Sequence, residues 1–545
     1  MFVPLGNEAI AQGALDAGLS GVYAYPGTPS TEITEYIQRS QQAQARGVHR
    51  DWSANEKTAM EAALGMSYVG KRAMVCMKHV GLNVAADPFM NSALTGANGG
   101  IIYVVADDPS MHSSQNEQDS RFFGKFAMIP VLEPSNQQEA YDVPFYAFEL
   151  SEKYTIPVLV RMTTRLSHSR ADITTRDPIP ENEIALPTNA QQFVLLPALA
   201  RKKYADLLKQ QADFILEAEQ SPFNRYEDHS DYGLGIIASG ITYNYLMENY
   251  PDGCPYPVLK IGQYPLPTKL IARLVDSCAS VLVLEEGMPL IEEQLRGYPF
   301  DTGKIRGRLD GSLPRAGELN PTLVAKALGI ETSPTFTVPP IVANRPPQLC
   351  QGCPHGDTFT ALNEALDQYS KGRVFSDIGC YTLGVLPPYN AINTCVDMGA
   401  SITMAKGAAD AGLLPAIAVI GDSTFAHSGM TGLLDVINAN KTVKIFIVDN
   451  QTTAMTGGQH HAGTGHLENI AIGLGVPEDH VRVITPLPRQ HADNVKVITE
   501  ELNYEGVSVI IARRECIETA KRHRKTAKQN DSPQSEDTTQ QKELA

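Results

Sequence analysis

The sequence predicts an α/β protein of three doubly wound domains followed by a disordered C-terminal tail. The chain of 545 residues is too long for a single hydrophobic core. Short apolar segments typical of buried strands alternate with segments typical of helices. Two proline-rich segments, 176–190 and 333–347, are expected to be linkers between the folded parts.

The first domain is predicted to span residues 1–175. A segment rich in Ala, Met and Leu at 55–68 is typical of a helix. Four apolar segments are expected to be buried strands: 21–27, 72–78, 99–108 and 157–163. Because these strands alternate with helical segments, we expect a sheet with helices on both faces.

The second domain is predicted at 191–332, the third at 348–520 and the tail at 521–545. The tail has almost no apolar residues and is therefore expected to be disordered. The strand candidates are 232–240, 255–262 and 280–287 in the second domain, and the apolar runs that end at Asp422 and Asn450 in the third.

The composition excludes several classes of protein. Hydrophobic residues make up 43% and charged residues 19%, as in ordinary soluble proteins. A net charge of −16 argues against a nucleic-acid partner. No apolar run is long enough for a membrane span, and the N-terminus lacks the pattern of a signal peptide. Eight cysteines in so long a chain do not suggest a disulfide scaffold, so we expect a reducing, cytoplasmic location.

The most informative motif lies at the ends of two strand candidates in the third domain. Gly421, Asp422 and Ser423 close the first strand, and Asn450 closes the second. Ligands collect at the carboxyl ends of parallel strands, and hard oxygen ligands suit a Mg²⁺ ion that is shared with phosphates. The carbonyl of Thr452 is a further candidate ligand. The order matches the GDG…NN motif that binds metal and diphosphate in thiamine diphosphate enzymes; the alternative is a strand end with ordinary polar turn residues.

Glu56 is the candidate for activating the other end of such a cofactor. Thiamine enzymes need a carboxylate beside N1′ of the aminopyrimidine, where it favours the imino tautomer that deprotonates C2. Glu56 opens the predicted helix at 55–68. The alternative is an ordinary carboxylate that interacts favourably with the helix dipole.

Polar residues after the strands of the first domain are candidates for a pocket. Pro26 and Thr28 lie in a strand-to-helix turn, YPGTPST, whose backbone N–H groups suit an anion, although a plain helix cap has the same pattern. Lys78 and His79 follow a strand directly, and we assign them as catalytic candidates.

The polar segment 107–121 is a candidate for substrate binding. His112, Ser113 and Arg121 are suited to a carboxylate substrate. The alternative is a solvated surface loop, but long loops in compact domains are often functional.

Four cysteines form a possible ligand set for one iron–sulfur cluster. Cys350 and Cys353 form a CxxC pair, Cys380 follows in GCY, and Cys516 follows a late strand candidate. A CxxC pair alone also fits a redox site, a zinc site or two buried thiols. Cys395 is a rival fourth ligand.

Assembled, these segments resemble the large, thiamine-binding subunits of indolepyruvate ferredoxin oxidoreductases, in the 2-oxoacid:ferredoxin oxidoreductase superfamily. The resemblance covers residues 6 to about 465, nearly all of the predicted folded chain. Its segments are GNEAIAQGALDAG, YPGTPSTEI, WSANEKTAMEAALG, MKHVGLNVAADP, ADDPSMHSSQNEQDSRFFGKFA, LCQGCPHG and the GDS…DN unit.

The resemblance implies a role for each domain and its candidates. The first domain would bind the aminopyrimidine, with Glu56 as the activating carboxylate and Thr28 in the pocket for the thiazolium and the oxoacid. The second is similar to a transketolase C-terminal domain. The third would bind diphosphate and Mg²⁺ through Asp422, Asn450 and Thr452. A proximal 4Fe–4S cluster is implied on the four cysteines at 350, 353, 380 and 516.

The resemblance also implies a reaction and partners. We expect oxidative decarboxylation of an aryl 2-oxoacid to its acyl-coenzyme A, with a small CoA-handling subunit and a homodimer of this chain. The family's large subunits usually end in a ferredoxin-like domain, whereas the folded pattern here ends soon after Cys516. Electrons are therefore expected to pass to ferredoxin or to a separate ferredoxin-type subunit. The alternatives are a non-oxidative thiamine decarboxylase or carboligase, and a catalytically silent assembly subunit.

Overall fold

The computed structural model contains three parallel or mostly parallel sheets, arranged in two compact units, residues 1–338 and 339–545. It describes residues 2–187, 189, 191–297, 302–332, 337–343 and 347–530. The central strands β2, β3, β13 and β14 are buried on both faces almost throughout, which explains the continuous apolar runs in the sequence. The predicted α/β fold is confirmed.

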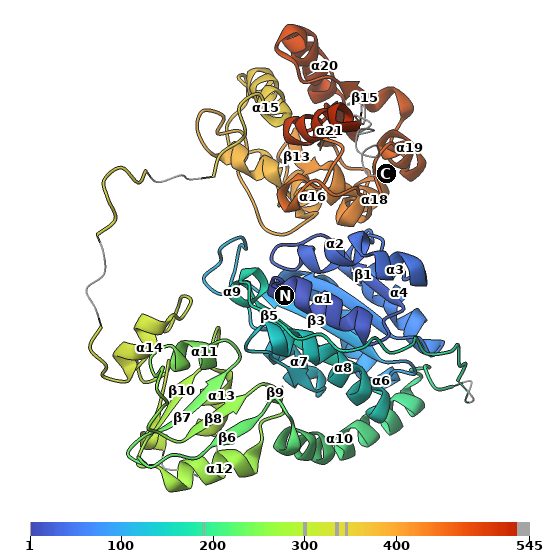
Figure 1. The fold of residues 1–545 in the computed structure, drawn as a ribbon. Helices are drawn as coiled ribbons and strands as arrows, with labels where there is room; N and C mark the ends of the chain where they lie inside the picture. The colour runs from blue at the N-terminus through green and yellow to red at the C-terminus, as the bar shows by residue number, and fades with distance from the viewer. Residues whose placement is uncertain are drawn as a thin grey trace, which may run out of the picture. The chain divides into compact units, whose positions relative to one another are not determined.

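The first unit begins with a six-stranded sheet in the order β1-β2-β3-β5-β4-β9 (Figure 1). Parallel strands β1, β2, β3 and β5 form its centre. The two faces of the sheet pack in two separate apolar clusters, one of them built around α1 and α8. The elements are α1 (Gly6–Asp16), β1 (Gly21–Ala24), α2 (Thr31–Arg39), α3 (Gln41–Arg46), α4 (Glu56–Tyr68), β2 (Ala73–Lys78), α5 (His79–Val84), α6 (Ala86–Thr95), β3 (Ile101–Asp107), α7 (Ser120–Ala127), β4 (Val131–Leu132), α8 (Gln137–Tyr154), β5 (Val158–Thr163) and α9 (Thr164–His168).

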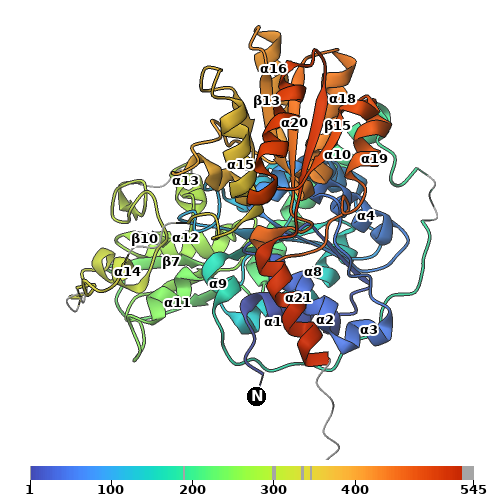
Figure 2. The same ribbon diagram turned by 90° about the horizontal axis from the view of Figure 1, so that it is seen from above.

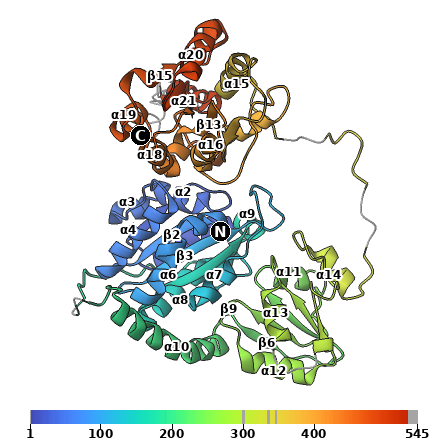
Figure 3. The ribbon, with the colours of Figure 1, turned by 180° about the vertical axis from the view of Figure 1, so that it is seen from behind.

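The second part of this unit contains a sheet with β6 among its strands (Figure 3). The sheet has five strands in the order β11-β10-β7-β8-β6. Its elements are β6 (Arg225–Glu227), β7 (Gly235–Ser239), α11 (Thr242–Met247), β8 (Val258–Ile261), β9 (Gln263–Tyr264), α12 (Thr268–Ser277), β10 (Val281–Leu284), α13 (Leu290–Arg296), the 3₁₀ turn η1 (Thr302–Lys304), β11 (Ile305–Arg306) and α14 (Pro321–Ala327).

The two parts of the first unit are joined by more than a linker. Strand β9 leaves its own part and pairs antiparallel with β4 of the first sheet. Helix α10 (Pro197–Gln220) packs against α6, β9 and α12 (Figure 1). Within the predicted linker at 176–190, the described residues run along the first part: the Ile179 N–H donates to Asp16 O (2.8 Å) and the Ala185 N–H to Val69 O (2.9 Å).

The second unit has a parallel sheet in the order β12-β13-β14-β16-β15. Helices α15 and α20 pack in the apolar cluster on one face, and α16, α18 and α19 in the cluster on the other (Figure 2). The elements are α15 (Pro354–Ala365), β12 (Val374–Ser376), η2 (Cys380–Val385), α16 (Ala400–Asp410), β13 (Ala416–Gly421), α17 (Asp422–Thr424), the π-turn η3 (Phe425–Gly429), α18 (Met430–Asn438), β14 (Val443–Asp449), η4 (Ala454–Thr456), α19 (Leu467–Leu474), η5 (Glu478–His480), β15 (Val481–Ile484), η6 (Pro488–Gln490), α20 (His491–Asn503), β16 (Ser508–Arg513) and α21 (Ile517–Asn530).

The C-terminal segment differs in part from the expectation of disorder. Residues 521–530 continue helix α21, which begins at Ile517 (Figure 2). Residues 531–545 of the predicted tail lie outside the described part of the chain, as do 333–336 and 344–346 of the second predicted linker.

Candidate active site

Glu56 is a buried carboxylate at the start of helix α4. Asn55 caps this helix, its Oδ1 accepting the N–H of Thr58 at 2.8 Å, so Glu56 is held in the first helical turn. The side chain is 5% exposed and lies against Gly81 in helix α5. A Cβ atom on Gly81 would stand 2.6 Å from Glu56 Oε1, so the absence of a side chain at 81 gives this carboxylate its place.

Lys78 ends strand β2 and packs against the turn that holds Thr28. Its aliphatic carbons pack against Gly27, where an added Cβ would be 3.2 Å from Lys78 Cγ. Burial lowers the pKa of Lys78, while the charges of Asp108 and Glu56 act in the opposite direction. Lys78 is therefore close enough to Glu56 for the carboxylate charge to act on its pKa.

The turn at 25–31 and the segment 107–121 meet beside Lys78. Ser113 Oγ donates to the carbonyl of Thr28 (3.3 Å), and Lys78 Nζ lies 3.5 Å from the carbonyl of Ser113. Pro26 is buried in the same turn, and Thr28 is half-buried. His79 is 1% exposed; its Nε2 lies 3.2 Å from Asn116 O, and its buried Nδ1 has no hydrogen-bond partner.

The other two candidates of segment 107–121 have different surroundings. His112 is exposed, and its Nε2 lies 3.5 Å from Glu318 Oε2 in the second part of the unit. Arg121 has a fully buried side chain that pairs with Asp119 (2.5 Å) and Glu285 (3.1 Å). Its remaining donors go to Tyr264 and to carbonyl oxygens, so a substrate carboxylate would find no free donor on Arg121.

Arg121 belongs to a buried charge network between the two parts of the first unit. Arg161 pairs with Asp107 and Glu133, and its Nη2 also donates to the Glu286 carbonyl (3.0 Å). Arg308 lies 3.5 Å from Glu286. Arg121 pairs with carboxylates instead of facing a substrate pocket because buried carboxylates need buried cations, and this arginine is packed among such carboxylates. The side-chain donors of Arg121 are thus engaged within this network.

Asp422 and Asn450 lie where the sequence predicted, at the ends of the neighbouring strands β13 and β14. Both are buried, at 2% and 7% exposure. The position before Asp422 has no room for a side chain, because a Cβ atom added at Gly421 would stand 2.6 Å from the ring of Tyr381. The Oδ1 of Asn450 accepts the N–H of Thr452 at 3.1 Å, which folds the chain tightly after β14. Ser423, in α17, is half-buried.

Two buried histidines, which the motif did not predict, stand beside these residues. His461 Nε2 lies 2.9 Å from Asp422 Oδ2. His355 Nε2 lies 3.2 Å from Asn450 Nδ2, and burial lowers the pKa of His355 to about 4, while the nearby charge of Asp422 opposes this shift. The sequence signal for His355 was its position directly after the CxxC segment; no comparable signal marked His461.

The residues of this edge fit Mg²⁺ and a diphosphate. A carboxylate, an amide and a backbone turn from adjacent parallel strands supply the oxygen donors that Mg²⁺ takes when phosphates complete its shell. Buried imidazoles such as His355 and His461, hydrogen-bonded to the proposed ligands, are of the kind that orient them.

Four cysteines of the second unit influence one another. Cys353 caps helix α15, and the N–H of Cys516 donates to the Asn450 carbonyl (3.0 Å). Burial, together with the neighbouring thiols of the set, raises the pKa of Cys353 to about 11 and that of Cys380 to about 12. Cys395 is exposed. Within the described ranges, no three His, Cys, Asp or Glu side chains are arranged to hold a metal ion.

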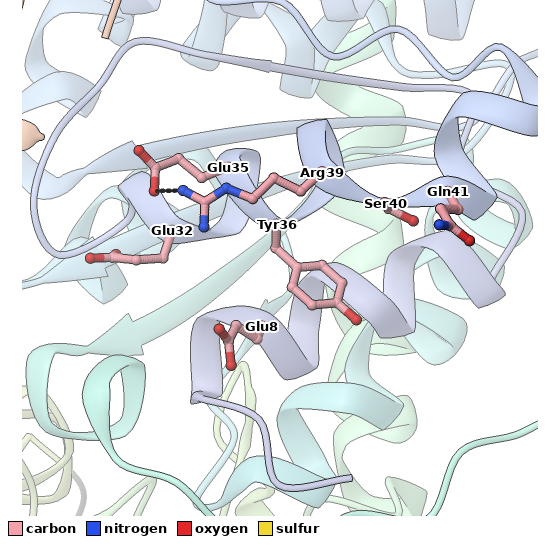
Figure 4. Close-up of a pocket in the computed structure, with 7 residues that line it drawn as sticks. All are labelled: Glu8, Glu32, Glu35, Tyr36, Arg39, Ser40 and Gln41. Carbon is pink, nitrogen blue, oxygen red and sulfur yellow. Dashed lines mark hydrogen bonds and ion pairs between the residues drawn. The ribbon is translucent and has the colours of Figure 1, made fainter. Parts of the chain in front are cut away.

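A separate open pocket lies on helices α1, α2 and α3 (Figure 4). Three carboxylates line it, and Arg39 pairs with one of them, Glu35, at 3.0 Å. None of the residues predicted for the site lines this pocket; those that do are Glu8, Glu32, Glu35, Tyr36, Arg39, Ser40 and Gln41.

Two family models match this chain. The family described as pyruvate flavodoxin/ferredoxin oxidoreductase, thiamine diphosphate-binding, matches residues 12–205. The thiamine pyrophosphate enzyme, C-terminal TPP binding domain, matches residues 377–511. These ranges contain Glu56 and the Asp422–Asn450 unit, so both matches fall on the predicted cofactor residues.

In the described part of the chain, no helix is long and apolar enough to cross a membrane.

Curated relatives extend the similarity over most of the chain. The indolepyruvate oxidoreductase subunit IorA of Pyrococcus abyssi is 42% identical, over 94% of this chain and 85% of its own length. The IorA subunits of Archaeoglobus fulgidus and Pyrococcus horikoshii are each 41% identical, again over 94% of this chain, and over 86% and 85% of their own lengths. The chain therefore belongs to the indolepyruvate oxidoreductase subunit IorA family of thiamine diphosphate-dependent 2-oxoacid oxidoreductases.

Proposed function

We propose that this chain oxidatively decarboxylates an aryl 2-oxoacid of the indolepyruvate type to its acyl-coenzyme A. In the overall reaction, the 2-oxoacid anion, coenzyme A thiol and two oxidised ferredoxins give the acyl thioester, CO₂, two reduced ferredoxins and one proton. The observation that carries the proposal is the placement of Glu56 against Gly81 in one unit and, in the other, of Asp422 and Asn450 at the ends of the paired strands β13 and β14. Thiamine diphosphate, when bound, supplies the electron sink for the carbon–carbon bond that breaks.

The residues of the first unit have separate tasks. Glu56 would lie beside N1′ of the aminopyrimidine and share a proton with it, a task that suits a buried carboxylate. Lys78 provides the positive charge for the substrate carboxylate, because its ammonium group lies beside the Thr28 turn and Ser113. His79, with a buried Nδ1 that has no partner, is a candidate to donate or accept a proton.

The residues of the second unit would bind the diphosphate of the cofactor and an iron–sulfur cluster that carries electrons. Asp422, Asn450 and the Thr452 carbonyl would bind Mg²⁺ and through it the diphosphate, with Gly421 and Ser423 beside them. Cys350, Cys353, Cys380 and Cys516 would hold one 4Fe–4S cluster; the effect of the other three thiols on the pKa of Cys380 supports a common neighbourhood.

The proposed enzyme works with partners. The names of the relatives describe subunits of an oxidoreductase, and we propose a small 2-oxoacid oxidoreductase subunit, a homodimer of this chain and a ferredoxin or ferredoxin-type subunit as electron acceptor.

The experiment that tests the function uses the Glu56→Gln variant. The chain, purified anaerobically with its small subunit, is assayed for CoA-dependent ferredoxin reduction with indolepyruvate, and its binding of Mg²⁺ and thiamine diphosphate is measured separately. We expect Glu56→Gln to bind the cofactor but to lose turnover. Glu61→Gln, on the exposed face of the same helix, is the matched control and should retain activity. Turnover in Glu56→Gln would disprove its role, and CO₂ release without ferredoxin reduction would favour the non-oxidative reaction.

A further inference from the structure

One buried histidine holds the side-chain amide of Asn450. His355 is 2% exposed, and its Nε2 lies 3.2 Å from Asn450 Nδ2. An amide nitrogen only donates, so Nε2 is the acceptor and the ring proton is on Nδ1. The Oδ1 of the same amide accepts the Thr452 N–H at 3.1 Å. Both ends of the amide are therefore fixed, and its orientation is set by His355 on one side and the turn on the other.

The same histidine stands among the segments that carry the cysteines. It follows Cys353 by two residues at the start of helix α15. Its ring meets the ring of Tyr381, the neighbour of Cys380, edge to face at 6.2 Å between centroids. Asn450 is the hydrogen-bond partner of His355, and the backbone carbonyl of Asn450 accepts the N–H of Cys516 at 3.0 Å. Three cysteine-bearing segments thus converge on the His355–Asn450 pair.

We propose that His355 is a positioning residue that holds Asn450 in the orientation needed to bind the Mg²⁺ of the diphosphate. This rests on the proposed function, because it assigns Asn450 to that metal. The first turn of α15, next to the CxxC pair, is thereby part of the diphosphate site. His355 acts through Asn450 and needs no contact with substrate or cofactor.

Removing the acceptor weakens metal binding. In His355→Ala, Asn450 Nδ2 is left buried without its partner, and the amide is free to rotate away from the metal. Residues that orient metal ligands typically change affinity by 10- to 100-fold when replaced, so we expect about tenfold weaker Mg²⁺-dependent binding of thiamine diphosphate. His355→Gln, whose Oε1 can accept from the same Nδ2, should restore affinity to within about threefold of the original.

A double-mutant cycle separates positioning from a general structural effect. The Mg²⁺ and thiamine diphosphate affinities are measured by titration calorimetry on the full chain with no substitution, and on His355→Ala, Asn450→Ala and the double variant. If His355 acts through Asn450, its replacement costs nothing further once Asn450 is gone. The matched control is His466→Ala, an exposed histidine of the same unit, which should bind like the original chain.

Each outcome decides between the alternatives. Weaker binding in His355→Ala, rescue by His355→Gln and no further loss in the Asn450→Ala background support the proposal. Equal affinity in His355→Ala, or an undiminished effect in the Asn450→Ala background, overturns it while leaving the proposed function intact. If the original chain itself binds no Mg²⁺ with thiamine diphosphate, both fail. Thermal unfolding checks the fold, and His355→Phe replaces the alanine variant if that variant does not fold.

Discussion

The carboxylate of Glu56 lies in the space that a side chain on Gly81 would occupy. An added Cβ at 81 would stand 2.6 Å from Oε1 and 3.0 Å from Cδ of Glu56. Contacts this short between atoms that are not bonded cannot persist, so any residue other than glycine at 81 must move the carboxylate. The placement of the proposed activating group is thus decided by a glycine on the neighbouring helix.

We therefore expect Gly81→Ala to lower turnover with little effect on stability. Displacing a reacting group by about 1 Å can cost about 100-fold in rate, so a decrease of at least about tenfold in kcat is expected. Alanine is a good helix residue, and the backbone at 81 is helical, so the unfolding temperature should stay close to that of the original chain.

Gly65→Ala is the matched control for this substitution. Gly65 lies on α4, the same helix as Glu56, and nothing is within 4 Å of a Cβ placed there. Its activity should be unchanged. Equal kcat values for Gly81→Ala and Gly65→Ala would contradict the positioning of Glu56 by Gly81.

The cysteine set predicts the iron content of the protein. A 4Fe–4S cluster held by four thiolates brings about four iron atoms per chain, and loss of one ligand makes it labile. Anaerobically purified Cys516→Ser should contain less than half of the iron of the original chain. The measurement is iron and labile-sulfide analysis together with the electron paramagnetic resonance spectrum after reduction.

Cys395→Ser tests the rival choice of ligand. Cys395 is exposed and lies outside the proposed set. Its substitution should leave iron and spectrum unchanged. The reverse pattern, with iron lost in Cys395→Ser and kept in Cys516→Ser, would replace Cys516 by Cys395 as the fourth ligand.

The buried network predicts a large stability effect for Arg121. Arg121→Gln leaves Glu285 without its buried cation and Asp119 with Arg161 alone (3.5 Å), and breaking a buried pair typically costs about 3–5 kcal/mol. Urea unfolding of the full chain should show this loss in the transition of the first unit. Arg39→Gln removes an exposed pair with Glu35 and should cost about 0–1 kcal/mol.

A different result would restore the role that the sequence predicted for Arg121. An Arg121→Gln protein with unchanged stability and a raised KM for the oxoacid would show that the guanidinium binds substrate rather than holding the two parts together.

The same network predicts how stability depends on pH. Burial raises the pKa of Glu286 to about 7, partly offset by the charge of Arg308. The folded state then binds more protons than the unfolded state between the ordinary value of 4.5 and about 7. The contribution of this group is fully present below pH 4.5 and is lost as the pH rises through about 7.

The measurement is the unfolding free energy of the full chain at several pH values between about 5 and 8. Glu286→Gln, which cannot ionise, should flatten the decrease with rising pH, and Glu61→Gln, at an exposed site, should not. A curve for Glu286→Gln that falls as steeply as that of the original chain would contradict the prediction.

Local pattern was sufficient for the strands that are buried on both faces and for one end of the site. The strand predicted at 72–78 is found as β2 (Ala73–Lys78) and that at 99–108 as β3 (Ile101–Asp107), because strands buried on both faces are apolar throughout. The two-residue strands β4 and β9 were not predicted. They exist only because distant segments pair, and two residues carry no periodic pattern.

The sequence by itself determined which chemical groups end the strands. Parallel neighbouring strands place their carboxyl ends at one edge, so Asp422 and Asn450 had to meet there once β13 and β14 paired. The tertiary structure alone decided which distant groups surround them: His355 reaches Asn450 across 95 positions of sequence, and Arg121 enters a buried network with Glu285. Such contacts depend on how whole elements pack and on the need to pair every buried charge, and neither condition is written in a local segment of the chain.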